Sequence, residues 1–224
     1  MKKLLVAIAL IVLVTPFHAA FADSIIASNP GGHAAFNVIP YGSLFGSGRY
    51  QEVYSSSLFT GPVEITSLAF SPQDTTFYAA NVDLRMTTTN VQVGNLSTNL
   101  DDNFTIPLTD VYSNPNFGEN VTGGSETFSL IFNLTNPFLY DPAQGNLLFD
   151  LVISDQNQNE AFSRSGTGSI LSRAYNSAAF GDGADGVGLR TEIGFTAVPE
   201  PGTLVMLGTG ALGLAGTIRR KLTQ

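Results

Sequence analysis

The sequence predicts an all-β body, a single antiparallel β-sandwich of jelly-roll type, on the basis of three observations. First, several short segments alternate hydrophobic and polar residues, as strands with one buried face do. Second, turn-forming pairs such as Ser71-Pro72, Asn114-Pro115 and Gly123-Gly124 separate these segments. Third, the body contains no stretch of ten or more residues with the hydrophobic period of a helix.

Nine segments of the body show the strand pattern. In residues 126–134, Phe128, Leu130 and Phe132 share one face, and polar residues share the other. Asp150 interrupts an apolar strand, and we expect its carboxylate on the solvated face of that strand. No internal repeat or long linker divides the body, so one domain over residues 23–197 is expected. The expected strands are residues 34–39, 49–54, 63–70, 77–88, 104–108, 126–134, 147–154, 169–175 and 187–196.

The composition of the 224-residue chain fits one globular domain and excludes several classes of function. Every lysine lies in the terminal segments, and residues 23–198 contain five arginines and 17 acidic residues, a net charge of −12. Because a body this acidic repels phosphate backbones, we expect no nucleic-acid partner. The chain has no cysteine, which excludes disulfides and thiolate metal sites.

The N-terminal segment has the three parts of a secretory signal peptide. Lys2 and Lys3 form the basic region, residues 4–14 are apolar, and Ala20-Phe21-Ala22 is an A-x-A cleavage site. We therefore expect residues 1–22 to be a helical signal peptide that signal peptidase removes before Asp23. The alternative is an uncleaved anchor, which is disfavoured because the apolar run is short for a membrane span.

The C-terminal segment is apolar and ends in three cations. As a helix, the uncharged residues 204–218 would extend about 22 Å, less than the roughly 30 Å of a membrane core. Glycines within this run weaken a helix in water but are tolerated in lipid. Arg219, Arg220 and Lys221 form a basic stop-transfer end that stays in the cytoplasm. We expect a transmembrane helix over residues 203–218, with a core helix of the domain as the alternative.

The order of motifs in this tail resembles a known sorting signal. Pro199-Glu200-Pro201 is followed by Gly202-Thr203, the apolar run and the basic end, which together resemble the PEP-CTERM signal of bacterial exported proteins. The resemblance implies that residues 198–224 are a sorting signal and that an exosortase cuts near the motif and releases or re-anchors the body. The inner membrane would then hold the chain only transiently, through the C-terminal helix. Two prolines keep such a recognition segment extended.

Three segments of the body also resemble a recurrent group of PEP-CTERM proteins. They are RYQEVYSSSLF (residues 49–59), NLSTNLDDNF (residues 95–104) and PFLYDPAQGNLLFDL (residues 137–151). The resemblance implies a secreted β-sandwich without an assigned activity. It leaves the molecular function of the body open.

The body contains few groups that support catalysis. His33 is the one histidine outside the signal peptide, and no Gly-x-Ser-x-Gly motif accompanies it. With one histidine and no cysteine, a catalytic zinc site is not expected. Two carboxylates suffice for a glycosidase, but no spacing in the sequence gathers a pair. We therefore expect no catalytic residue and no covalent chemistry.

Calcium is the metal that the sequence favours most, at a Gly-rich acidic stretch. GDGADGVG (residues 181–188) places Asp182 and Asp185 on a predicted loop that can turn oxygen ligands toward a hard cation. The stretch lacks the ligand order and the closing glutamate of an EF-hand. The alternative is an ordinary acidic turn, in which case the chain has no cofactor.

Three classes of function remain in order of preference. The first is an exported, non-catalytic protein of the cell surface or extracellular matrix, for which the resemblance implies association with exopolysaccharide. The second is a secreted carbohydrate-binding module, although the chain has no tryptophan to provide the largest stacking face. The third is a secreted glycoside hydrolase. The candidate stacking residues for the second class are Tyr50, Tyr54, Tyr78, Tyr112 and Tyr140.

Overall fold

A computed structural model describes residues 22–31, 36–41, 45–73, 76–79, 81–124, 126–155 and 161–198, together with Gly208 and Gly210. The chain divides into two compact units, Ala22–Thr196 and the combined ends Met1–Phe21 with Ala197–Gln224. Within the described residues, no helix has the length and apolar character needed to cross a membrane. The predicted transmembrane segment 203–218 lies outside them, apart from the two glycines.

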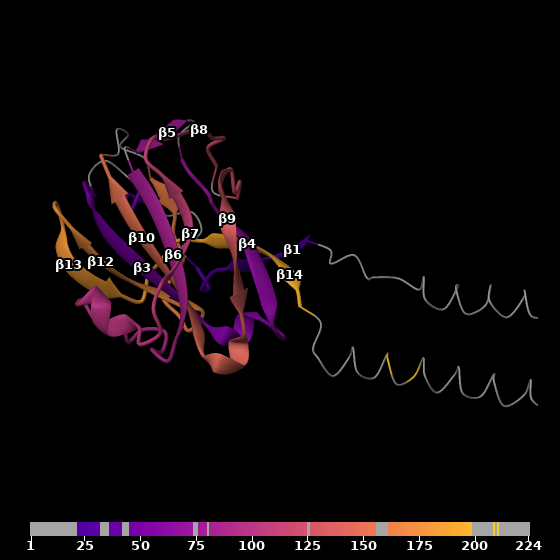
Figure 1. The fold of residues 1–224 in the computed structure, drawn as a ribbon. Helices are drawn as coiled ribbons and strands as arrows, with labels where there is room; N and C mark the ends of the chain where they lie inside the picture. Colours follow the sequence, from indigo (N-terminus) through magenta and orange to yellow (C-terminus); the bar gives the residue numbers. More distant parts are fainter. Residues whose placement is uncertain are drawn as a thin grey trace, which may run out of the picture. The chain divides into compact units, whose positions relative to one another are not determined.

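Two antiparallel sheets pack as a sandwich in the unit Ala22–Thr196, which confirms the predicted sandwich (Figure 1). One sheet has four strands in the order β1-β14-β4-β9, and the other has six in the order β13-β12-β3-β10-β6-β7. The bounds in the first sheet are β1 (Ala22–Ala27), β14 (Thr191–Ala197), β4 (Val63–Phe70) and β9 (Leu130–Tyr140). In the second they are β13 (Gly181–Asp185), β12 (Leu171–Ser177), β3 (Gly48–Tyr54), β10 (Asn146–Ser154), β6 (Asn81–Thr89) and β7 (Thr109–Asn114).

Short elements complete the body. Two small pairs are formed by β11 (Phe162–Ser163) with β2 (Phe36–Asn37), and by β5 (Thr76–Ala79) with β8 (Phe117–Asn120). Single 3-10 turns are η1 (Ser56–Leu58), η2 (Leu100–Asn103) and η3 (Pro142–Gln144). The Ser55 and Asp141 side chains cap η1 and η3 by accepting from backbone N–H groups, so both turns start at residues that favour capping.

The core lies between the two sheets and is rich in aromatic side chains. Phe70 of β4 and Phe132 of β9 are fully buried, with ring centroids 6.0 Å apart. Phe149 of β10 lies 6.1 Å from Phe70, and Tyr41 lies 5.1 Å from the same ring. These contacts join the inner faces of both sheets. Each buried ring removes about 150–250 Å² of surface from water, so this cluster is a major source of stability.

A segment without strands covers part of the outer face of the six-stranded sheet. This cover segment, residues 90–108, contains η2 and packs Leu96 and Leu100 against Val53 of β3 and Leu148 of β10. A second hydrophobic cluster therefore forms on a face that alternation alone assigns to solvent. It is the feature of the fold that creates the candidate site described below.

Most predicted strands match observed ones, and the differences have local reasons. The predicted strand 104–108 is wrong, because these residues belong to the cover segment and the chain pairs with the sheet only from Thr109, in β7. The predicted strand 77–88 corresponds to two strands, β5 and β6, which pair with different partners. The strand β1 was not expected, since its residues are mostly exposed and carry a weak hydrophobic alternation.

The strands β1 and β14 bring the two ends of the body together. They pair antiparallel from Ala22 opposite Thr196 to Ala27 opposite Thr191. Residue 22, at the predicted signal peptidase site, and the residues just before the predicted sorting motif therefore lie side by side at one end of the four-stranded sheet.

Candidate functional site

Three segments that the sequence analysis singles out, residues 49–59, 95–104 and 137–151, meet at one place, around Asp150. The first segment supplies Arg49 and Gln51 of β3, the second supplies residues of the cover segment, and the third supplies Asp150 of β10. The register of the sheet sets this arrangement, because Gln51 and Arg85 lie directly opposite Asp150 on its two neighbouring strands. Side chains of all three strands at this level point to the same outer face.

Asp150 is fully buried, so the expectation that it lies on a solvated face is wrong. Its Oδ1 accepts from Arg49 Nε at 2.7 Å and from Gln51 Nε2 at 2.8 Å. Its Oδ2 accepts from Arg85 Nε at 2.8 Å and forms an ion pair with the same guanidinium. The alternation of side chains along β10 correctly predicts that the carboxylate lies on the outer face. The cover segment and the two arginines, however, shield this face from water. Two cations and an amide offset the cost of burying this charge.

A chain of hydrogen bonds continues from Asp150 into the cover segment. Gln51 Nε2 also donates to the Leu100 carbonyl at 3.0 Å, and Gln51 Oε1 accepts from Asn103 Nδ2 at 2.8 Å. The side-chain Oδ1 of Asn103 in turn accepts from the Ser97 backbone N–H at 2.7 Å, and the backbone carbonyl of Asn103 accepts from Thr89 Oγ1 at 2.6 Å. Buried polar groups in such a network specify a single arrangement. The network therefore fixes the cover segment on the sheet.

Arg49 links the buried network to the surface. Its Nε contacts Asp150, while its Nη1 forms a 2.6 Å ion pair with Asp101, whose side chain is 73% exposed. The guanidinium carbon also lies 5.8 Å from the centre of the Phe104 ring. Partial burial lowers the pKa of Arg49, but the hydrogen bonds and charges of Asp101 and Asp150 raise it above its ordinary value. Arg49 is thus a fixed cation with a preset orientation.

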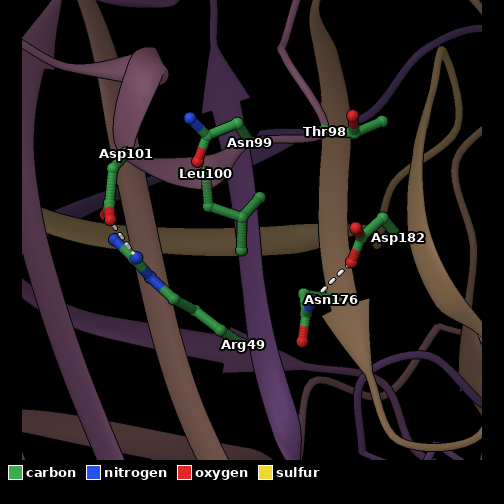
Figure 2. A pocket seen from close by; sticks show the side chains of 7 residues that line it. All are labelled: Arg49, Thr98, Asn99, Leu100, Asp101, Asn176 and Asp182. Atoms are coloured by element: carbon green, nitrogen blue, oxygen red, sulfur yellow. Dashed lines mark hydrogen bonds and ion pairs between the residues drawn. The ribbon is translucent and has the colours of Figure 1, made fainter.

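A polar pocket of about 530 Å³ opens beside Arg49 (Figure 2). We call it the outer pocket. Arg49 and Asp101 lie on one side, and Asn176 of β12 and Asp182 of β13 lie on the other, where their side chains are hydrogen-bonded to each other. Asn176 lies opposite both Arg49 and Asp182 in the sheet register, so three strands present these side chains in one row. The lining residues are Arg49, Thr98, Asn99, Leu100, Asp101, Asn176 and Asp182.

The two predicted calcium ligands do not come together. Asp182 and Asp185 lie on the strand β13, not on a loop, and residues three apart in a strand face opposite sides. Asp182 contacts Asn176 on the outer face, whereas Asp185 accepts two hydrogen bonds from Arg173 at 3.0 and 2.9 Å. A single cation cannot bind both carboxylates in this arrangement. Within the described residues, no group of three or more His, Cys, Asp or Glu side chains is placed to hold a metal ion.

Glu52 forms a second polar cluster, inside the sandwich. It is fully buried, and its Oε2 accepts from Tyr50 Oη at 2.5 Å and from the Leu189 N–H at 3.2 Å. Burial raises the pKa of Glu52 from 4.5 to about 8, although these two hydrogen bonds and the charge of Arg173 act in the opposite direction. An acid with this pKa is neutral at pH 7 and resembles a general acid. However, the Glu52 side chain has no exposure to solvent, so the geometry favours a structural role.

The four tyrosines with described side chains, out of the five predicted to stack on sugars, do not form a stacking surface. Tyr50, Tyr54 and Tyr140 are fully buried, and Tyr112 is half-buried against the core, so this part of the prediction is wrong. The alternation of inward and outward side chains along each strand directs these tyrosines inward. There the hydroxyl groups of Tyr54 and Tyr140 donate to Thr191 Oγ1 and to the Gly145 carbonyl. The Tyr78 side chain lies outside the described residues.

The terminal site residues are only partly described. Ala22 is the first residue of β1, whereas Ala20, His33, the Pro199-Glu200-Pro201 motif and the basic end Arg219-Arg220-Lys221 lie outside the described residues. The Asp150 network and the outer pocket were not foreseen as a site. The one sequence signal for them is the expectation that three segments distant in the chain, residues 49–59, 95–104 and 137–151, resemble one group of proteins.

Comparison with known proteins identifies one part of the chain. Residues 197–221 match a family model described as the PEP-CTERM protein-sorting motif. No curated protein matches the chain, and no solved structure does. The sorting segment is thus recognised, and the body is not assigned by similarity.

Proposed function

Because the chain carries a PEP-CTERM sorting motif at its C-terminus, we propose that it is a non-catalytic protein of the cell surface or extracellular matrix, associated with exopolysaccharide. The motif implies an exported protein that an exosortase processes and sorts to the cell surface. In our proposal, signal peptidase cuts after Ala22 and the C-terminal helix anchors the chain transiently in the inner membrane. The exosortase then acts near Pro199-Glu200-Pro201.

The observation that carries this proposal is the sorting motif, and the chemistry of the body supports it. The most deeply buried charged side chains of the body are engaged in structural contacts. Asp150 is held between two arginines, Arg173 is paired with Asp185, and Glu52 is enclosed in the core. A catalytic acid or base must reach its substrate, and a carboxylate sealed from solvent does not.

The strand order supports a jelly-roll assignment for the body. Most successive strands cross between the sheets, so that β1, β4, β9 and β14 form one sheet and β3, β6, β7 and β10 belong to the other. The β12–β13 hairpin extends the second sheet at its β3 edge. We propose that the body is a jelly roll with this added hairpin. Jelly rolls include many lectin domains, which is compatible with an attachment to glycans.

Sorting is tested by altering the motif in the native host. We expect the triple variant Pro199→Ala/Glu200→Ala/Pro201→Ala to keep its tail and to stay in the membrane fraction. Thr223→Ala/Gln224→Ala, which changes residues beyond the basic end, is the matched control and should be processed normally. Cell fractionation with intact-mass measurement of the mature protein provides the readout. A triple variant with the mature mass and location of the unaltered protein would refute the sorting proposal.

Matrix association and the absence of catalysis need a separate experiment. We expect the mature protein to co-sediment with exopolysaccharide isolated from the host, and to release no new reducing ends from it during prolonged incubation. Recovery of the protein only in the soluble medium contradicts association with the matrix. Turnover that is lost on substitution of Asp101 or Asp182, with the fold intact, favours the hydrolase alternative, because both carboxylates line the outer pocket.

A further inference from the structure

We propose that the outer pocket binds an uncharged saccharide and thereby selects neutral polysaccharide over acidic polysaccharide. This inference rests on the proposed association with exopolysaccharide and adds the place and the class of sugar. It follows from three properties of the pocket: the hydrogen-bonding groups of its lining, its charge, and the rigidity of the elements that form it.

The lining presents the groups that sugar hydroxyls need. A hydroxyl both donates and accepts, so it pairs with carboxylates, amides and guanidinium groups. Asp101 and Asp182 can only accept, Arg49 can only donate, and Asn99 and Asn176 do both. Figure 2 shows these groups on opposite sides of the pocket, with Leu100 between them as an apolar contact. The volume of about 530 Å³ lies within the range of about 300–1,000 Å³ typical of small-molecule sites.

The charge of the lining decides which saccharide fits. Arg49 is the one cation among the lining residues, and Asp101 and Asp182 outnumber it. Arg49 is also already paired with Asp101 at 2.6 Å and with Asp150 at 2.7 Å, so its charge is largely neutralised. The body as a whole carries a net charge of −12 over residues 23–198. A polyanion such as a uronate polymer is therefore repelled at long range and finds no free cation in the pocket.

The elements around the pocket are fixed before a ligand arrives. Arg49 is oriented by the buried Asp150, and the cover segment is held by Gln51 and Asn103. Asn176 and Asp182 lie on paired strands of the sheet. Preorganised groups bind with a smaller entropy cost than mobile ones. No aromatic side chain belongs to the lining, so stacking adds nothing and we expect a dissociation constant on the order of 1 mM for a short oligosaccharide.

Binding is tested with three probes on the mature protein: cellohexaose, chitohexaose and hexagalacturonate. Saturation-transfer NMR and calorimetry measure the interaction. We expect at least one of the two neutral hexamers to bind and the hexagalacturonate not to bind. Asn176→Ala/Asp182→Ala should weaken binding at least tenfold. Asn99→Ala removes a lining amide that has no side-chain hydrogen bond within the described part of the chain, and it should weaken binding about threefold.

The control variant is Asp83→Ala/Ser113→Ala. It removes a hydrogen bond of 2.6 Å from the Ser113 hydroxyl to the Asp83 carboxylate, on the outer face of the same sheet but outside the pocket. We expect it to bind as the unaltered protein does, and circular dichroism checks that every variant is folded. Equal or tighter binding of hexagalacturonate, no binding of either neutral hexamer, or unchanged binding by both pocket variants would overturn the inference. If any of these occurs while the protein still co-sediments with the matrix, only the pocket assignment fails; without co-sedimentation, the proposed function fails as well.

Discussion

Replacing Glu52 by glutamine should remove a pH dependence of stability that the buried carboxyl imposes on the fold. Glutamine has nearly the same shape and imitates the neutral acid, but it cannot ionise. The group sits among Tyr50 of its own strand, Arg173 directly opposite on β12, and the backbone N–H of Leu189. Tyr41 and Tyr54, whose pKa values are raised by burial and by the charge of Glu52, also surround it, and the charge of Asp185 adds to the rise in the pKa of Glu52.

The size of the effect follows from the pKa of Glu52, which burial raises from 4.5 to about 8. Below pH 4.5 the carboxyl is protonated in both the folded and the unfolded chain, and its contribution to stability is complete. Between pH 4.5 and 8 only the folded chain keeps the proton, so stability falls by about 1.4 kcal/mol per pH unit. The total loss from this group approaches about 5 kcal/mol at pH 8, and above that pH it stays constant.

The assay is urea unfolding of the unaltered protein and of Glu52→Gln at several pH values from 4.5 to 8.5. Because the chain has no tryptophan, far-ultraviolet circular dichroism follows the transition. We expect the two proteins to have similar free energies of unfolding near pH 4.5, and the variant to become progressively more stable by comparison as pH rises. Glu64→Gln, an exposed site on β4, is the control for the loss of one carboxylate. A difference between the unaltered protein and Glu52→Gln that stays constant with pH would refute the reasoning.

Four further outcomes are expected. Asp150→Asn should lower the free energy of unfolding by about 3 kcal/mol, since it leaves two arginines without their shared counter-charge, and denaturant unfolding measures the loss. Gly188→Ala should cost about 1–3 kcal/mol in the same assay, because a Cβ there would lie 2.6 Å from Glu52 Oε1; an unchanged midpoint contradicts this close packing. A chain truncated before Val198 should keep the circular dichroism and cooperative unfolding of the body, while losing its sorting; failure to fold refutes the boundary. Terminal sequencing of the exported protein should begin at Asp23, and retention of the N-terminal lysines refutes that cleavage site.

The secondary structure of the body was predictable where buried and exposed residues alternate along the chain. The strands β3, β4 and β10 match their predicted ranges closely, because their inner residues are apolar and turn residues flank them. The strand β1 escaped prediction since an edge strand with mostly exposed residues needs little hydrophobic alternation. The segment 104–108 has a strand-like composition, but the sheet pairing begins only after it. Pairing partners, which lie far apart in the chain, decide such cases.

The candidate site was predictable only in fragments. Asp150 was correctly assigned to the outer face of its strand and wrongly assigned to solvent, because alternation does not show what covers a face. Tyrosine is a residue type that can stack on sugars. Tyr50 and Tyr54, however, occupy inward-facing positions of their strand, so their side chains lie in the core. Asp182 and Asp185 are close in the sequence, yet a strand puts them on opposite faces.

The sequence by itself determined the all-β class of the body, most of its strands, its acidity and the sorting motif at its end. These properties depend on local composition, on a short period or on a contiguous motif, so they can be read without knowing any contact. Only the tertiary structure decided that residues 90–108 cover the outer face of the six-stranded sheet, and that Arg49, Gln51 and Asp150 form one network. The physical reason is that burial and hydrogen bonding between distant segments depend on sheet register and on loop placement, which no short stretch of the chain encodes.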